Sequence, residues 1–272
     1  MAYKIGWFST GRDQAAADLL RAVHQSIQRG EIEAEISFVF SNRRRGEAEV
    51  SDRFFRLVKQ FGIDLVSLSS RDYEPQLRRE DLPAWRRVYD RQVMQLVDRY
   101  QVDLNVLAGY MLILSEQMCR AYTIINLHPA APGGPKGTWQ EVIWQLIEKR
   151  AESTGVTIHR VTEILDEGPP ITYCRFPIRT GQLQRLWEDT ERRLKTMPLS
   201  QIQKEEGENN PLFRQIRQQG VIREIPLIVQ TIKWFAQGRI KIKGGELTVD
   251  GQKCPGGLDM TEEIDQIIGR EK

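Results

Sequence analysis

The amino-acid sequence predicts an α/β fold with a Rossmann-like, mainly parallel sheet covered by helices on both faces. Short apolar runs alternate with amphipathic segments of roughly 15 residues, which is the pattern of right-handed β-α-β units. The apolar runs lack a polar face, as expected for strands that are buried on both sides. Ligands of such sheets bind beyond the carboxyl ends of the strands, so polar residues at strand ends are the first candidates for a site.

Five strands are predicted in the first half of the chain, each a short apolar run that ends at a turn. They are expected at 3–9, 35–42, 64–69, 102–109 and 123–128. Apolar residues at helical spacing predict the helices between them, at 14–28, 49–62, 83–100 and 114–122. In the first of these helices, Leu19, Val23 and Ile27 fall on one face.

The second half of the chain predicts a helix, two strands, a polar segment, and then a helix with a small hairpin. The helix is expected at 138–150, and strands at 154–164 and 169–178 are joined by the sequence LDEG. From 186 to 219 the chain is strongly polar, which predicts one or two exposed helices around a flexible EEGENN loop. An amphipathic helix at 223–238 ends at a glycine, and a hairpin follows that turns at Gly244–Gly245.

These elements predict one α/β domain that carries a polar helical insert. The expected division is 1–185 for the α/β domain and 186–220 for the insert. Residues 221–255 are expected to form the helix and hairpin that complete the same domain, and 256–272 to form a mobile tail.

The composition excludes several classes of protein. A hydrophobic content of 40% and a charged content of 28% are typical of globular proteins, and a net charge of +2 gives no reason to expect a nucleic-acid-binding surface. The N-terminus turns polar too early for a signal peptide, and the most apolar run, 105–114, is too short to cross a bilayer. We therefore expect a cytoplasmic protein without membrane contact, in which Cys119, Cys174 and Cys254 stay reduced.

Candidate catalytic residues gather at the end of the fifth predicted strand. Asn126 and His128 are two residues apart, so their side chains leave the strand on the same side, and His159 and Asp166 follow on the next strand and its turn. An amide donates to a developing oxyanion, an imidazole exchanges a proton near neutral pH, and a neighbouring carboxylate fixes its tautomer. The set suits attack of an amine on an acyl carbon. Two satisfied core histidines are the structural alternative, and no metal-ligand spacing is present, so no metal is expected.

Three segments, LAGYMLIL, NLHP and GVTIHRVTEILDEGPPI, stand in an order and at distances that resemble the folate-dependent formyltransferase family. The sequences FVFSN, WRRVYDRQVMQLVDRY and PLIVQTIKWFAQGRIKI add to the resemblance, which covers most of the chain outside 186–219 and the ends. It is nearest to the branch of purine synthesis and one-carbon metabolism, in which 10-formyltetrahydrofolate formylates the amine of glycinamide ribonucleotide. The resemblance implies the formyltransferase fold and this transferase activity.

The resemblance also implies roles for particular residues. Asn126 would donate to the oxyanion, His128 would be the catalytic imidazole, and Asp166 would pair with it and assist proton transfer. The implied folate-binding residues are Met111, Leu112, Leu114, Val161 and Leu165. The implied substrate-binding residues are Gly11, Arg12, Asp13, Arg86 and Lys136. The expected partners are small molecules, the amine among them phosphorylated, and the expected state is a monomer or homodimer.

Three departures from the family pattern bear on the acceptor. The loop STGRDQ has one Gly where the family's purine enzyme wraps a phosphate, and Asp13 is either an anion at that site or the N-cap of the next helix. The loop HPAAPGGPKG is smaller and stiffer than the family's HPSLLP, and its Lys136 is either exposed or meets an acidic substrate group. The polar insert is the third departure. Beyond it, Glu224 lies near, but not at, the position of a family Glu that contacts the substrate ribose.

Two other functions remain open from the sequence. A family member that acts on another amine, such as a nucleotide-linked amino sugar, would account for the altered loops and the insert. A non-catalytic folate- or nucleotide-binding module is the alternative from a different class, although the retained Asn126, His128 and Asp166 count against it. A formyl-methionyl-tRNA enzyme and a formyltetrahydrofolate hydrolase are disfavoured, because the chain shows neither an extra C-terminal nor an extra N-terminal domain.

Overall fold

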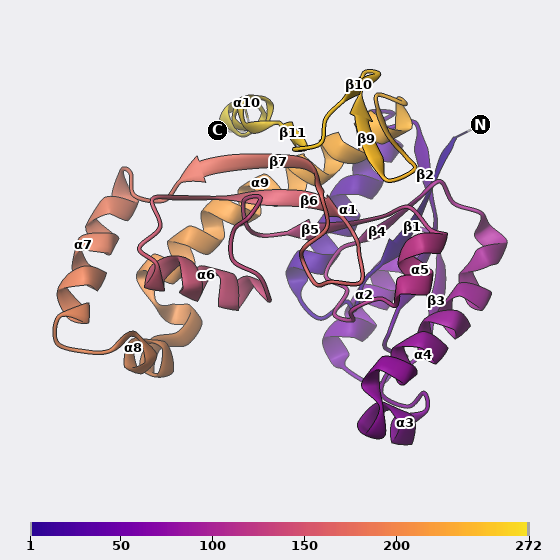
Figure 1. Ribbon diagram of the computed structural model, residues 1–272, viewed down its shortest axis with the longest axis horizontal. Coiled ribbons are helices and arrows are strands. Elements are labelled where there is room, and N and C mark those ends of the chain that lie inside the picture. The colour runs from indigo at the N-terminus through magenta and orange to yellow at the C-terminus, as the bar shows by residue number, and fades with distance from the viewer. Residues whose placement is uncertain (1, 271–272) are drawn as a thin grey trace.

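Eight strands form one sheet in the computed structural model, which describes residues 2–270 of the chain (Figure 1). They are β1 (Tyr3–Phe8), β2 (Ala34–Ser41), β3 (Asp64–Ser67), β4 (Leu104–Leu107), β5 (Ile124–His128), β6 (Ser153–Arg160), β7 (Pro170–Pro177) and β11 (Leu258–Asp259). Their order across the sheet is β11-β7-β6-β5-β4-β1-β2-β3. β6 runs antiparallel to β5 and β7, and the other pairs are parallel. The predicted mainly parallel sheet is confirmed.

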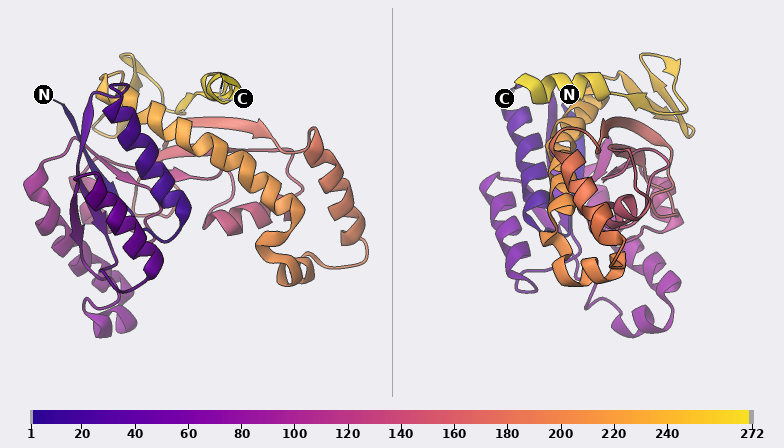
Figure 2. Two further views of the ribbon diagram at one scale, coloured as in Figure 1. Left: turned by 180° about the vertical axis from the view of Figure 1, so that it is seen from behind. Right: turned by 90° about the vertical axis from the view of Figure 1, so that its left-hand side faces the viewer.

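Helices cover both faces of this sheet (Figures 1 and 2). One face packs α1 (Gln14–Gln28), α2 (Glu49–Gln60), α6 (Trp139–Glu148), α7 (Gln182–Leu194), α9 (Pro211–Ala236) and α10 (Thr261–Arg270). The other face packs α4 (Leu82–Val97) and α5 (Glu116–Ala121). Two short helices, α3 (Pro75–Glu80) and α8 (Leu199–Glu206), complete the set, with 3₁₀ turns at Asp98–Tyr100 and Gly207–Asn209. Within residues 2–270, no helix combines the length and apolar character that crossing a bilayer requires.

The sheet packs into two hydrophobic cores, one on each face, and this explains why the strands lack a polar face. On β1, Ile5 and Trp7 are fully buried in the core beneath α1 and α9, whereas Phe8 is fully buried in the core beneath α4. Since successive side chains of a strand point to opposite faces, both sides of β1 are covered by helices. Helices therefore leave no room for a ligand on either face of the sheet at β1. A ligand can bind only in the crevice beyond the carboxyl ends of the strands.

The polar segment from 186 to 219 is less exposed than its composition predicts. It contains most of α7, all of α8, and the first third of α9, which continues unbroken past the expected division at 220/221. Trp187, Ile202 and Phe213 are almost fully buried, because each helix keeps an apolar stripe between its charged residues. α9 begins with Asn210, whose side chain accepts a hydrogen bond from the Phe213 N–H at 3.0 Å. This N-cap is the start signal that the sequence interpretation missed.

The expected mobile tail is instead part of the fold as far as residue 270. β11 pairs in parallel with β7, and α10 follows with Ile264 fully buried. The Thr261 hydroxyl accepts a hydrogen bond from the Arg175 N–H at 2.9 Å, just beyond that pairing. The predicted hairpin is confirmed as β8 (Ile240–Lys243) and β9 (Glu246–Val249), to which β10 (Gln252–Lys253) adds a third strand.

Candidate active site

A cavity of about 330 Å³ opens beyond the carboxyl ends of β1, β4 and β5. This is the point where the chain order of the sheet reverses, because β1 pairs with β2 on one side and β4 on the other. The lining comes from the start of α1 and α6, the loops after β4, β5 and β6, and one face of α9. It includes Arg12, Asp13, 109–113, 126–129, 137–139, Glu141, Leu165, Asp166, Arg217 and Glu224. The site thus forms where doubly wound sheets bind ligands.

The strand pairing brings Asn126 and His159 together. β5 and β6 are antiparallel with Asn126 opposite His159, and the Asn126 Nδ2 atom lies 3.1 Å from the His159 Nε2 atom. The His159 Nδ1 atom lies 3.0 Å from the Arg160 carbonyl oxygen, which can only accept, so Nδ1 carries the proton in the neutral ring. Nε2 then accepts a hydrogen bond from the Asn126 amide. One amide N–H is fixed in this way, and the other is left for a ligand.

His128 is held by the loop that follows it. Its Nε2 atom lies 2.8 Å from the Pro135 carbonyl oxygen, which requires Nε2 to donate. Its Nδ1 atom faces the Asp166 Oδ2 atom at 3.6 Å. The His128 side chain is only 9% exposed, so few other orientations are open to the ring. With Nε2 occupied by Pro135, Nδ1 is the nitrogen that is available for proton exchange.

Asp166 lies on a constrained loop between β6 and β7. Its backbone has a φ of +54°, a conformation that an Asp adopts more readily than most residues. Its Oδ2 atom accepts a hydrogen bond from the Gly137 N–H at 3.2 Å, and its Oδ1 atom lies 3.7 Å from the His159 Nε2 atom. Gly168 lets the loop return over β6, because a Cβ atom there would lie 1.6 Å from the Arg160 carbonyl oxygen. An ion pair between Lys136 and Glu167 joins this loop to the loop HPAAPGGPKG, residues 128–137, which follows β5.

The protonation states follow from this packing. Burial lowers the pKa of His128 below its ordinary value, and the opposing effects of Asp166 and Pro135 are smaller. Burial alone would raise the pKa of Asp166, but the two histidines and the Gly137 N–H together lower it. At neutral pH the free site therefore holds a neutral imidazole beside a carboxylate.

The lowered pKa of His128 predicts how stability depends on pH. The unfolded chain binds this proton more tightly than the folded protein, so the contribution to stability is complete above about pH 6.5 and is lost as the pH falls below that value. Asp166 changes the stability with pH only below about pH 4. Burial also lowers the pKa of His24, so His24 lowers the stability at acidic pH in the same direction as His128. Between pH 7 and pH 5 the melting temperature should fall more in the wild type than in His128→Gln. Calorimetry at both pH values measures this, and an equal fall in both proteins would contradict it.

The structure brings together most, but not all, of the predicted site residues. Asn126, His128 and Asp166 share the cavity with Met111, Leu112, Leu165, Arg12 and Asp13. The predicted residues that do not line it are Gly11, Arg86, Leu114, Lys136 and Val161.

The structure shows where these five side chains lie instead. Leu114 and Val161 are buried in the core beneath α4, because the backbone turns their side chains away from the cavity. Arg86 lies on α4 near the buried Asp90, on the other face of the sheet. Lys136 forms an ion pair with Glu167 outside the cavity lining. The Gly11 N–H donates to the Ser9 hydroxyl at 3.2 Å.

Two lining residues on α9 were not assigned to the site from the sequence. Arg217 was missed, and Glu224 was noted only as near the position of a family residue. They are seven residues apart, so they lie on the same face of the helix, and their side chains form an ion pair. The Glu224 side chain is 6% exposed. A charged pair at helical spacing is usually a solvated surface feature, so spacing alone would not have identified these two residues.

Comparison with known proteins gives consistent matches. A profile of the family described as formyl transferase matches residues 12–197. The phosphoribosylglycinamide formyltransferase of Escherichia coli (strain K12) is 28% identical over 239 residues, which are 87% of this chain and 90% of that protein. Relatives of this kind are enzymes of formyl transfer in purine synthesis.

Solved structures share the fold. A phosphoribosylglycinamide formyltransferase from Coxiella burnetii, in complex with CHES, aligns with a TM-score of 0.69 at 22% identity over 95% of this chain and 99% of that one. A formyltetrahydrofolate deformylase from Pseudomonas syringae pv. tomato str. DC3000 aligns with a TM-score of 0.62 at 20% identity over 92% and 66%. These likenesses confirm the predicted fold, which both kinds of enzyme use.

Proposed function

We propose, on the premise that the chain belongs to the formyl transferase family, that it passes the formyl group of 10-formyltetrahydrofolate to the amine of glycinamide ribonucleotide. The family and its relatives in purine synthesis make the chain a folate-dependent formyltransferase. The identity of the acceptor and the roles of individual residues are the parts that are proposed.

The observation that carries the proposal is the shared cavity of Asn126, His128 and Asp166. One amide N–H and the Nδ1 atom of an imidazole are available there beside an ionised carboxylate. Met111 and Leu165 line the same cavity and are 42% and 49% exposed. Exposed apolar side chains at the edge of this cavity suit the flat ring system of a folate, which would cover them.

The residues support a direct transfer. The amine of the acceptor attacks the formyl carbon, and the carbonyl oxygen gains negative charge. The free Asn126 N–H donates to that oxygen, and so does His128 once Nδ1 is protonated, while Asp166 at 3.6 Å stabilises the imidazolium. The carboxylate of Asp166 accepts the proton that the amine loses and passes it to Nδ1 of His128, 3.6 Å away, which is neutral in the free site. The bond between the formyl carbon and N10 of the folate then breaks, and N10 takes up that proton from the imidazolium, so one proton moves from the amine to N10 and the exchange is balanced.

Formyl transfer by the purified chain tests the proposal. The chain is incubated with 10-formyltetrahydrofolate and glycinamide ribonucleotide, and both tetrahydrofolate and the formylated acceptor are measured. Equal amounts of the two products would support the proposed acceptor. Transfer to a nucleotide-linked amino sugar, but not to glycinamide ribonucleotide, would move the function to the second acceptor class.

A second candidate function is hydrolysis, because formyltetrahydrofolate deformylases share the fold. In that reaction water takes the place of the amine, and formate appears without any acceptor. If formate were released at the same rate with and without an amine, the function would be hydrolysis and not the proposed transfer. Folate binding with neither product would identify a binding module.

A further inference from the structure

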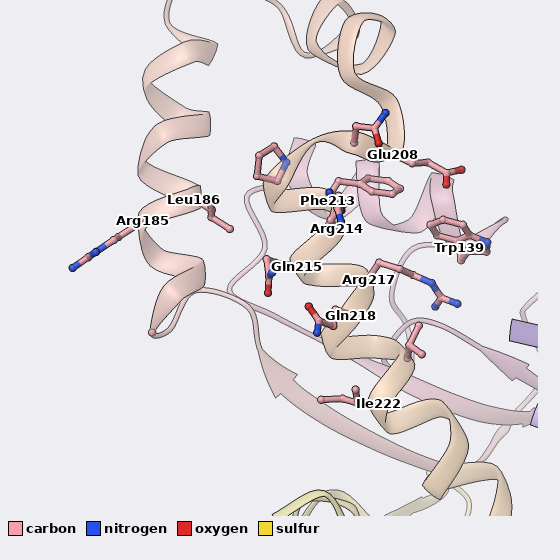
Figure 3. Close-up of a pocket in the computed structure, with 14 residues that line it drawn as sticks. Trp139, Arg185, Leu186, Glu208, Phe213, Arg214, Gln215, Arg217, Gln218 and Ile222 are labelled. Atoms are coloured by element: carbon pink, nitrogen blue, oxygen red, sulfur yellow. The ribbon is translucent and has the colours of Figure 1, made fainter. Parts of the chain in front are cut away.

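Paired side chains hold the wall that α9 contributes to the cavity lined by Asn126 and His128. The Arg217 guanidinium lies 4.7 Å from the centre of the Trp139 ring and forms an ion pair with Glu224. In Figure 3, Arg217 extends from α9 toward Trp139, at the border between the cavity and a groove of about 1340 Å³ between α7 and α9. This wall is therefore fixed by contacts between side chains.

The loop 109–113, which follows β4, is another wall of the cavity and is held in a different way. Within residues 2–270, its backbone makes two hydrogen bonds to other parts of the chain, and both involve Thr10. The Thr10 N–H donates to the Gly109 carbonyl oxygen at 3.1 Å, and the Met111 N–H donates to the Thr10 hydroxyl at 3.0 Å. Thr10 is 2% exposed and does not line the cavity. One buried residue thus anchors the backbone of this wall.

The hydroxyl of Thr10 also belongs to a longer chain of hydrogen bonds. Because the Met111 N–H can only donate, the hydroxyl accepts from it and gives its own proton to the Asn42 Oδ1 atom at 2.7 Å. The Asn42 Nδ2 atom then donates to the Ser70 hydroxyl at 3.2 Å. Asn42 and Ser70 are 5% and 7% exposed. Loss of the Thr10 hydroxyl would therefore leave two polar groups without a partner, at Met111 and at Asn42.

This chain of hydrogen bonds joins the ends of four neighbouring strands. Met111 follows β4, and Thr10 follows β1. Asn42 and Ser70 follow β2 and β3, which are the next strands of the sheet. Because these strands are fixed in the hydrophobic cores, the chain connects the loop 109–113 to a rigid part of the molecule.

We infer that Thr10 is a positioning residue, which holds the loop 109–113 in the arrangement that binds the folate. This inference rests on the proposed function for the identity of the ligand. Met111 is 42% exposed in that loop, and a loop that must first become ordered binds its ligand less tightly. Asn126 and His128 are held by His159 and by the Pro135 carbonyl, so the effect falls on binding and not on the chemical step.

Replacement of Thr10 by Val tests the inference, because Val keeps the shape of Thr and lacks its hydroxyl. Calorimetric titration with tetrahydrofolate should give a dissociation constant about tenfold above the wild-type value, as for a loop that is in its binding arrangement about a tenth of the time. Thr10→Ser keeps the hydroxyl and should recover most of the affinity. In turnover, Thr10→Val should raise KM for 10-formyltetrahydrofolate and leave kcat within about threefold of the wild type.

The matched control is Thr231→Val. Thr231 is fully buried, and its hydroxyl lies 2.6 Å from the Thr172 hydroxyl and 2.7 Å from the Leu227 carbonyl oxygen, away from the cavity lining. This variant should also have a lowered melting temperature, but its dissociation constant for tetrahydrofolate should equal that of the wild type. In the free proteins, the amides of 109–113 should exchange hydrogen faster in Thr10→Val and at the wild-type rate in Thr231→Val.

Four outcomes would contradict these expectations. An unchanged dissociation constant in a folded Thr10→Val protein would overturn the inference, and so would equal losses of affinity in Thr10→Val and Thr231→Val. A rise in KM for the acceptor without a rise for the formyl donor would place the effect in the loop before α1. If the wild type bound no tetrahydrofolate, the proposed function would fail, and hydrogen exchange at 109–113 would still decide whether Thr10 holds the loop.

Discussion

Replacement of His128 by Ala is expected to lower kcat for formyl transfer by about 10² to 10⁴-fold, the usual contribution of a positioned acid or base. The variant loses the Nδ1 atom that faces Asp166 and the link from Nε2 to the Pro135 carbonyl. The first loss removes charge stabilisation at the formyl oxygen and the second removes the contact that holds the ring in place, so kcat should fall much more than KM rises. Single-turnover kinetics with saturating folate and acceptor measure the effect on the chemical step.

The matched control is His24→Gln. His24 lies on α1, stacks on Phe61 at the end of α2 and does not line the cavity, so kcat of this variant should stay close to the wild-type value. A melting curve for each variant separates loss of chemistry from loss of fold. If His128→Ala kept more than a third of the wild-type kcat while folded, the imidazole would have no part in the reaction.

Replacement of Asn126 by Ala is expected to lower kcat by about 10² to 10³-fold, the usual effect of removing one oxyanion donor. The nearly isosteric Asn126→Asp variant is the sharper test, because it keeps the shape of the side chain but cannot donate when ionised. It also places a second carboxylate near Asp166, so its kcat should be at least as low as that of Asn126→Ala. An Asp variant that is as active as the wild type would show that the amide donates nothing to the transition state.

The role of His159 follows from the same contact. Its Nε2 atom fixes the orientation of the Asn126 amide, although the ring has no direct part in the proposed reaction. In His159→Gln a hydrogen-bonding group remains, and the loss of kcat should be smaller than in Asn126→Ala. A loss as large as that of His128→Ala would instead make His159 a participant in proton transfer.

The parts of the site that are local in the chain could be predicted from the sequence. Asn126 and His128 are two residues apart on one strand, and period-two geometry alone places them on the same side. The first five strands are short apolar runs that end at turns, and the helices between them have strong apolar periodicity, so their types were confirmed and only their ends shifted. The short helix α3 was missed because six residues carry too little periodicity.

Contacts between distant segments could not be predicted in the same way. Arg217 and Glu224 reach the cavity only because α9 packs beside α1, some 200 residues earlier in the chain (Figure 2). Lys136 was predicted as either exposed or substrate-binding, since nothing near it in sequence indicates its ion pair with Glu167. Leu114 and Val161 lie next to segments that line the cavity, but the direction of each side chain depends on the local backbone, which the sequence pattern does not reveal.

The pairing of β11 with β7 has a consequence far from the chemistry. β7 would otherwise be an outer strand whose unpaired N–H and C=O groups could recruit a strand from another molecule. Two residues of β11 occupy part of that edge, and the Met260 N–H and the Thr261 hydroxyl satisfy the neighbouring Tyr173 carbonyl and Arg175 N–H, at 2.8 and 2.9 Å. The segment 258–261 thus covers part of a strand edge that could pair with another molecule, and so disfavours intermolecular β-aggregation. Fusions or deletions that disturb it should reduce the yield of monodisperse protein even where the cavity lined by Asn126 and His128 is intact.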